Sequence, residues 1–163
     1  MTLRGPRVEL VPVAPEHHRR LDELRRLPEV LRWWQSPEED WLAEDPDVVR
    51  YAVLLEGTVV GYIQWWQDSE PKYRHAGVDL FVEPAAPGLG TEALQVVCAH
   101  LVDDHGFHRL VIDPEVANER AIASFRKVGF KPVGVLRRYF RHDDGEWVDG
   151  LLMDLLADEL VRP

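Results

Sequence analysis

The spacing of hydrophobic residues along the chain changes between the period of a β-strand and the period of an amphipathic helix. Residues 76–82 alternate and are rich in β-forming side chains, which predicts a strand. A few residues later, hydrophobic side chains recur at helical spacing, on Leu94, Val97, Cys98, Leu101 and Val102. The same reading of the whole chain predicts strands at residues 8–13, 51–55, 58–66, 76–82, 109–113, 133–141 and 147–155.

Local start and stop signals mark the ends of the expected helices. Asn118 is a typical N-cap residue and Gly129 is a typical C-terminal residue, so a helix is expected between them. An earlier helix is expected to end near Pro28. No repeat, low-complexity tract or linker interrupts the pattern, and we therefore expect one domain over residues 1–163.

The composition indicates a soluble protein of a reducing compartment. Hydrophobic residues make up 45% of the 163 residues, and no apolar run approaches the length of a membrane span. The first residues lack the apolar core of a signal peptide. Cys98 is the single cysteine and lies on the apolar stripe of its helix, so we expect a core residue and no disulfide. These features predict a cytoplasmic protein without a membrane segment.

The chain carries a formal net charge of −10. An acidic protein is a poor partner for nucleic acid or for an anionic membrane surface, so neither is expected. The acidity has two possible meanings, which charge alone does not separate: it aids solubility, or it attracts a cationic substrate. The seven histidines show neither cysteine partners nor the spacing of a zinc site, and no metal is expected.

Gly88 and Gly90 lie between the strand at 76–82 and the helix that follows. Glycines in this position let backbone N–H groups approach an anion, and the helix start adds further donors. No Lys-Ser or Lys-Thr follows, so the nucleoside-triphosphate loop is excluded. The dinucleotide pattern fits in part, but Pro84 and Pro87 separate the strand from the first glycine. The remaining alternatives are a loop for a different phosphorylated cofactor and a plain tight turn.

Two segments of the chain resemble the GNAT superfamily of N-acetyltransferases. Residues 80–94 resemble the family's acyl-coenzyme A pyrophosphate loop. Residues 118–130 resemble its Asn-x-x-Ala-Ile-x-x-Tyr-Glu-Lys-x-Gly-Phe segment. The resemblance implies acetyl-CoA as co-substrate. It also implies an α/β (α+β) fold with a mixed, mostly antiparallel central sheet of about seven strands, splayed in the middle and flanked by about four helices.

The resemblance also implies which residues bind the cofactor, and two positions depart from the family. The expected cofactor-binding residues are Phe81, Val82, Ala86, Pro87, Gly88, Leu89, Gly90, Thr91, Asn118, Ala121, Phe125 and Lys127. Ala85 replaces the Gln or Arg that usually opens the loop. Phe125 replaces the tyrosine that protonates the departing thiolate, so that proton is expected to come from water. These two departures favour the alternative of a non-catalytic acyl-CoA-binding module.

Asp79 stands in the middle of a predicted strand, where aspartate is disfavoured and needs a reason. A salt bridge to Arg74 or Arg109 is the structural explanation, and a functional role is the alternative. On residues 28–34, 61–64 and 77–79, and on Asp113-Pro114 followed by Asn118, the chain looks most like the aminoglycoside 6′-N-acetyltransferases of the superfamily, in which Asp79 would be the catalytic carboxylate. That resemblance predicts substrate binding by Trp33, Trp34, Asp68, Asp79 and Asp113.

The carboxy-terminal third resembles ribosomal-protein N-terminal acetyltransferases equally well, so a protein N-terminus remains an alternative acceptor. In either case we expect direct transfer to a primary amine, by a monomer or a homodimer. Each adjacent tryptophan pair, 33–34 and 65–66, is expected to place one ring in the core and to leave the other for a cleft wall.

Overall fold

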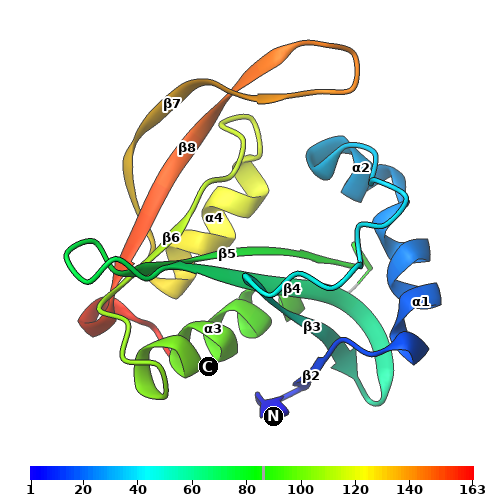
Figure 1. Cartoon of the computed structure of the whole chain (residues 1–163), viewed down its shortest axis with the longest axis horizontal. Helices are drawn as coiled ribbons and strands as arrows, with labels where there is room; N and C mark the ends of the chain where they lie inside the picture. The colour runs from blue at the N-terminus through cyan, green and yellow to red at the C-terminus, as the bar shows by residue number, and fades with distance from the viewer. Residues whose placement is uncertain (86) are drawn as a thin grey trace.

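The computed structural model describes residues 1–85 and 87–163, and one mixed sheet runs through the molecule (Figure 1). Within these residues, eight strands lie in the order β1-β2-β3-β4-β5-β6-β8-β7. The strands are β1 (Leu3–Arg4), β2 (Val8–Pro12), β3 (Val48–Leu55), β4 (Thr58–Asp68), β5 (His75–Val82), β6 (Arg109–Ile112), β7 (Lys131–Arg141) and β8 (Trp147–Leu156). All neighbouring strands are antiparallel except β5 and β6, which are parallel. The predicted fold class is confirmed. The additional strand is β1, whose two residues are too short to show a period.

The described residues form four α-helices and one short 3₁₀ helix. They are α1 (Pro15–Arg25), α2 (Pro28–Trp34), α3 (Leu89–Asp103), α4 (Glu119–Val128) and η1 (Ala157–Glu159). Pro28 ends the first helix as expected and also opens the second, because proline is well accepted in the first turn. No helix within the described ranges is long and apolar enough to cross a membrane.

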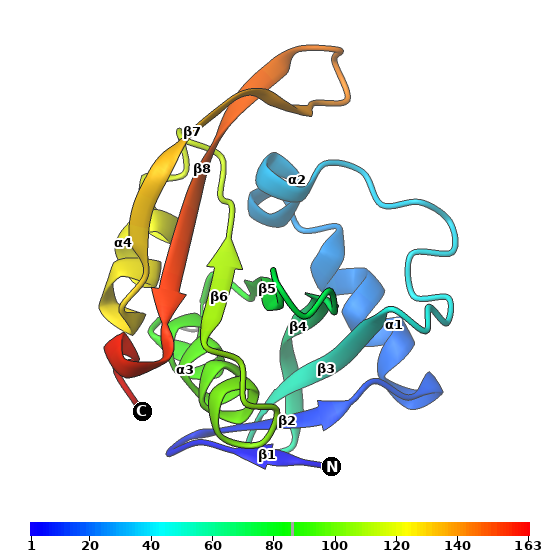
Figure 2. The same cartoon turned by 60° about the vertical axis from the view of Figure 1, so that its left-hand side comes forward.

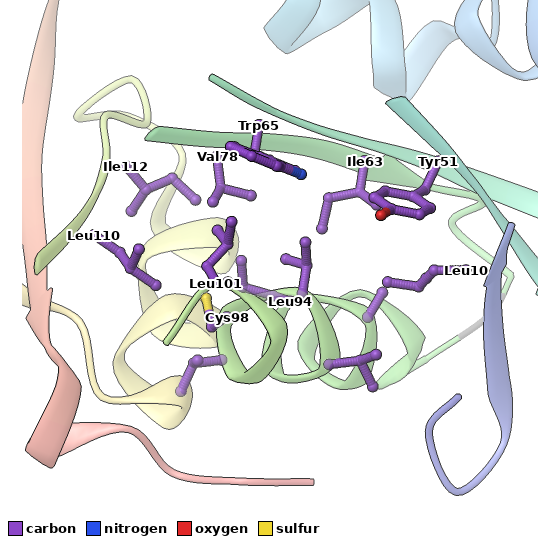
Figure 3. Packing of buried hydrophobic residues seen from close by; sticks show 14 of the residues in the cluster. Leu10, Tyr51, Ile63, Trp65, Val78, Leu94, Cys98, Leu101, Leu110 and Ile112 are labelled. Atoms are coloured by element: carbon purple, nitrogen blue, oxygen red, sulfur yellow. The ribbon is translucent and has the colours of Figure 1, made fainter. Parts of the chain in front are cut away.

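Helix α3 packs against one face of the sheet and holds the main core (Figure 3). Leu94, Cys98 and Leu101 of this helix are fully buried beneath Ile63 and Val78 of the sheet. The prediction that Cys98 is a core residue is confirmed, and burial raises the pKa of its thiol. The cysteine is therefore a neutral packing group rather than a nucleophile.

Helices α1 and α2 cover the opposite face of the sheet and enclose a second hydrophobic cluster (Figure 1). Its buried members are Leu21, Leu24, Val30, Ala52, Tyr62 and Phe81. Tyr62 and Phe81 stack with ring centroids 5.5 Å apart. Because side chains alternate along a strand, Asp79 points to the same face as Phe81. The second cluster therefore lies on the same face of the sheet as Asp79.

Strands β5 and β6 separate soon after they meet. Their pairing is confined to Ala76 with Leu110 and Gly77 with Val111, while β5 continues to Val82. The predicted splay in the middle of the sheet is therefore present. Beyond Gly77, the ladder between β5 and β6 does not continue within the described residues, which leaves a strand edge that an extended ligand can bind.

The long hairpin of β7 and β8 rises beyond the rest of the sheet, and its tip bends towards α2 (Figures 1 and 2). Asp143 at this tip accepts hydrogen bonds from the Ser36 backbone N–H, 2.9 Å, and hydroxyl, 2.7 Å. Its own N–H donates to Gln35 Oε1 at 2.8 Å. The hairpin is thereby pinned to the end of α2, on the other side of the splayed strands.

Candidate functional site

A cleft, here called the loop cleft, opens between the end of β5, the start of α3 and helix α4. Of the residues expected to bind the cofactor, those that line it are Phe81, Val82, Gly88, Gly90, Thr91, Asn118, Ala121 and Phe125. Leu89 is buried beneath it, whereas Pro87 and Lys127 are exposed and are not among its lining residues. Ala86 lies outside the described residues. The two sequence blocks, residues 80–94 and 118–130, therefore line one cleft together with residues of α2.

The start of α3 has the geometry of an anion site. Gly88 is the N-cap and has a φ of +79°, a left-handed conformation that favours glycine. The helix begins at the next residue, and the first N–H groups of any helix lack intrahelical acceptors. Gly90 lies against the β5 residue Val82, since an added Cβ would come within 3.1 Å of that side chain. Backbone donors and the positive end of the helix dipole thus face the loop cleft.

A cation beside this loop comes from a distant part of the sequence. A Cβ on Gly88 would lie 3.3 Å from the Arg7 guanidinium, which belongs to the turn between β1 and β2. Arg7 Nε donates to Glu92 Oε2 at 2.8 Å, and the N–H groups of Arg7 and Val8 donate to Glu92 Oε1 at 2.6 and 3.0 Å. Burial opposes ionisation of Glu92, but these hydrogen bonds hold its pKa below the usual value. The sequence gives no local signal for this pairing of residues 85 positions apart.

Helix α4 closes the loop cleft with mostly apolar and hydroxyl side chains. Asn118 caps the helix by accepting a hydrogen bond from the Ala121 N–H at 3.2 Å, which confirms its predicted capping role. Phe125 is 9% exposed and packs edge-on against Phe130, with centroids 6.4 Å apart. Ser124 Oγ lies 2.5 Å from Thr91 Oγ1. These two hydroxyls join helix α4 to the start of α3.

A second cleft, here called the acidic cleft, lies between α2, the splayed strands and the β7–β8 hairpin. Its volume of about 550 Å³ is in the usual range of small-molecule sites. The carboxylates that line it are Asp79, Asp113 and Glu115, and the aromatic rings are Trp33, Trp34, Trp66, Phe125, Tyr139 and Phe140. Asp68, also expected to bind substrate, lies at the end of β4 and is not among the lining residues. Aromatic walls and carboxylates together suit an organic cation.

Asp79 lies in the acidic cleft and is oriented by a chain of hydrogen bonds. Gln64 Nε2 donates to Asp79 Oδ2 at 3.1 Å, and the Tyr62 hydroxyl donates to Gln64 Oε1 at 2.7 Å. Burial raises the pKa of Tyr62 to about 12, so the phenol keeps the proton that it donates. Burial, reinforced by the charge of Asp113, raises the pKa of Asp79 to about 6, although the Gln64 hydrogen bond acts in the opposite direction.

The structural explanation considered for Asp79, a salt bridge to an arginine, is wrong. Arg74 instead donates to the carbonyl oxygens of His105 and Gly106, at 2.7 and 3.1 Å. Arg109 pairs with Asp154 at 3.1 Å. The Asp79 side chain is therefore partly buried, and its hydrogen-bond partner is the neutral amide of Gln64 and not an arginine. This arrangement suits proton transfer near neutral pH.

Asp113 is the second carboxylate of the cleft and accepts a hydrogen bond from the Tyr139 hydroxyl. Burial raises the pKa of Asp113, while the bond from the phenol works against that rise. The same bond, followed by burial, raises the pKa of Tyr139 to about 12. Because Tyr139 belongs to the hairpin, the acidic cleft is complete only when the hairpin is in place.

The four adjacent tryptophans behave differently in the two pairs. Trp65 is 6% exposed and lies in the core, whereas Trp66 is 37% exposed and lines the acidic cleft, as predicted for that pair. Gly77 makes room for Trp66, because any side chain there would overlap the indole ring. Trp33 and Trp34 are both partly exposed and both line the two clefts. Of this pair, Trp34 packs against the second hydrophobic cluster, with its ring edge-on to Phe81 at 5.1 Å between centroids, so the expectation of one core-packed ring holds here too.

Arg25 holds Trp34 in position, and the sequence offers no signal for this role. Arg25 is 5% exposed, and its guanidinium donates to the carbonyl oxygens of Gln35 and Trp34 at 2.7 and 3.0 Å. It also lies over the Trp34 ring, 5.2 Å from the centroid. The end of α2, where the hairpin docks, is therefore built on a buried cation.

Among the described residues, no group of three or more His, Cys, Asp or Glu side chains could hold a metal ion.

The chain is similar in sequence to known acetyltransferases. A family model described as "Acetyltransferase (GNAT) family" matches residues 13–130. The chain is 26% identical over 133 residues to aminoglycoside N(6′)-acetyltransferase type 1 of Klebsiella pneumoniae, covering 66% of this chain and 65% of that protein. It is also 26% identical over 148 residues to spermidine N(1)-acetyltransferase of Escherichia coli K12, covering 82% and 77% of the two chains.

A solved structure of Mycobacterium smegmatis RimJ in complex with CoA-disulfide superposes with a TM-score of 0.82 at 22% identity. The alignment covers 99% of this chain and 88% of that chain. At this identity, the likeness demonstrates a shared fold. The chain spans about two thirds of the length of the first curated relatives that it matches, 65%.

Proposed function

The chain belongs to the GNAT family of acetyltransferases, and from that premise we propose that it transfers an acetyl group from acetyl-CoA to a primary amine of a cationic small molecule. The proposed acceptor is an aminoglycoside, acetylated at its 6′-amine. We further propose that residues 1–163 act as one catalytic domain in the cytoplasm. The resemblance to the aminoglycoside enzyme and the acidic, aromatic cleft support this acceptor class.

In this proposal the cofactor occupies the loop cleft. The pyrophosphate lies at the start of α3, on the first N–H groups of the helix and beside Arg7, whose charge replaces the side-chain anchor lost at Ala85. The pantetheine arm follows the free edge of β5 at Phe81 and Val82 and ends at the splay. The thioester then meets the acidic cleft, because Leu80, Asn118, Ala121 and Phe125 line both clefts.

The proposed chemistry is direct transfer to the amine. Asp79 first accepts a proton from the acceptor ammonium, directly or through water, and the free amine attacks the thioester carbonyl. The new C–N bond forms and the C–S bond breaks, so the sulfur leaves with the electron pair. With phenylalanine at position 125, the thiolate takes its proton from solvent, which is adequate for a thiol of pKa about 8.5. No enzyme nucleophile is needed, in keeping with the buried Cys98.

The observation that carries the proposal is the environment of Asp79, which raises the pKa of its carboxyl group and fixes its orientation. A carboxylate whose pKa is raised to about 6, oriented by Gln64 in a cleft beside the cofactor site, is suited to act as a base near neutral pH. The resemblance to spermidine N(1)-acetyltransferase favours a second candidate acceptor, an aliphatic polyamine. A protein N-terminus and a non-catalytic acyl-CoA-binding role are further outcomes that one experiment distinguishes.

The experiment measures thiol release from acetyl-CoA in the presence of aminoglycosides, polyamines and a peptide N-terminus. We expect release with aminoglycosides, and mass spectrometry should locate the acetyl group on the 6′-amine. Faster release with polyamines would favour the second candidate, and faster release with the peptide would transfer the assignment to protein N-termini. Calorimetric binding of coenzyme A without release for any amine would overturn catalysis and indicate a binding module.

A further inference from the structure

Glu115 lies beside Asp113 on the wall of the acidic cleft. Backbone bonds hold the segment extended against β8, from the Leu151 N–H to Pro114 O at 2.8 Å and from the Val116 N–H to Asp149 O at 2.9 Å. In an extended segment, side chains two residues apart point to the same side and lie about 7 Å apart. Asp113 and Glu115 therefore line the same wall, and both border the cleft.

The imidazole of His142, in the turn of the β7–β8 hairpin, orients the Glu115 carboxylate. His142 Nε2 lies 2.9 Å from Glu115 Oε2, and the two side chains are 21% and 11% exposed. His142 also faces the Phe140 ring, with centroids 5.9 Å apart, and is followed by Asp143, which pins the hairpin to α2. The histidine holds one carboxylate oxygen, and a carboxylate has a second oxygen that can accept further hydrogen bonds.

The charges of the cleft favour an acceptor with more than one ammonium group. Three carboxylates line the wall, at positions 79, 113 and 115, while the partner of Asp113 is the neutral phenol of Tyr139. A single ammonium at Asp79 would leave Asp113 with the phenol of Tyr139 and Glu115 with the imidazole of His142 as their partners. Carboxylates removed from water in this way are stabilised by a charged hydrogen-bond donor.

On the basis of the proposed function, we infer that Glu115 is a specificity residue that binds a second ammonium group of the acceptor, and that His142 is its positioning residue. The first ammonium reaches Asp79 and is acetylated. The second ammonium binds between Asp113 and the free oxygen of Glu115, further along the same wall. The cleft thereby selects diamines and larger polycations over monoamines of the same length.

The test compares kinetics on an aliphatic diamine and on the monoamine of equal chain length. The variants are Glu115→Gln, which keeps the shape of the side chain and removes its charge, Glu115→Asp and His142→Gln. The matched control is Glu146→Gln, an exposed glutamate of the same hairpin. Thermal melts of every variant report whether the hairpin and the fold are intact.

We expect Glu115→Gln to raise KM for the diamine by about tenfold or more, the usual effect of losing a charged hydrogen bond. KM for the monoamine and kcat for both should stay within about twofold. Glu115→Asp should recover part of the diamine preference, and His142→Gln should lose part of it. Glu146→Gln should behave as the unaltered protein does.

If the contact between Glu115 and His142 only holds the hairpin in place, the kinetics will differ from this expectation. Equal losses on the diamine and the monoamine, together with a lower melting temperature, would overturn the specificity role, and so would an unchanged diamine preference. If the unaltered protein acetylates no amine, the proposed function fails and this inference fails with it. Acetylation of both amines with no selective effect of Glu115→Gln would overturn the inference alone.

Discussion

Replacement of Asp79 by asparagine should stabilise the fold while it removes activity. The pKa of Asp79 is raised from 3.8 to about 6, so the folded protein binds this proton more tightly than the unfolded chain does. The ionised carboxylate therefore opposes folding, and this effect grows as the pH rises from the unfolded pKa through the folded one. At about 1.4 kcal/mol per pKa unit, the opposition amounts to about 3 kcal/mol at pH 8 and roughly half of that at pH 5.

Thermal and urea unfolding of Asp79→Asn at the two pH values measure this effect. For a chain of this length, about 3 kcal/mol corresponds to a rise in Tm of roughly 6–12 °C at pH 8, with a smaller rise at pH 5. Asp47→Asn is the matched control, because Asp47 is exposed and lies away from the cleft residues. It should leave both curves unchanged.

Activity and cofactor binding complete the test of Asp79. We expect kcat/KM for the working amine to fall by roughly 10²-fold or more, as for the loss of one positioned general base. Coenzyme A affinity should stay near that of the unaltered protein. A variant that is less stable at pH 8 would show that the carboxylate supports the fold, and full retention of activity would refute its role as the base.

Three further substitutions test other parts of the site. Arg7→Gln should weaken coenzyme A binding by about tenfold, most clearly at low salt, and an unchanged affinity in calorimetry would remove Arg7 from the cofactor site. Gly88→Ala should cost about 1–2 kcal/mol of stability because of its left-handed φ and should also weaken coenzyme A, whereas Gly57→Ala, at a φ of +80° in open space, should lose stability alone. Arg25→Met should lower the free energy of unfolding by about 2–4 kcal/mol, because two partly buried carbonyls lose their charged donor, and an effect below about 1 kcal/mol in urea unfolding would contradict that role.

The sequence by itself predicted most of the helices and strands and the glycine loop before α3. The predicted helix capped by Asn118 and closed by Gly129 is α4, and the glycine loop does open a helix after a strand. Periodicity, caps and turns depend on residues that are close in sequence, so a single sequence reports them well. The splay of the sheet followed from the family resemblance and is also present.

Only the tertiary structure decided which distant side chains meet. Gln64 of β4 lies opposite Asp79 on the neighbouring strand β5, and the Arg7 side chain lies at the start of α3. The tertiary structure also places Asp68 and Lys127 outside the lining of both clefts, although the sequence resemblance includes them among the candidates. Strand order and register decide such contacts, and a local pattern carries neither.

The acidic cleft shows the same limit most clearly. Its outer wall exists because Asp143 binds Ser36, 107 residues earlier in the chain, and brings His142 to Glu115. In the sequence these are four unremarkable polar residues from three separate segments, with His142 and Asp143 adjacent in one of them. The hydrophobic pattern determines which residues are buried and which elements form, but the position of a polar loop residue is determined by the geometry of the packed sheet on which it is carried.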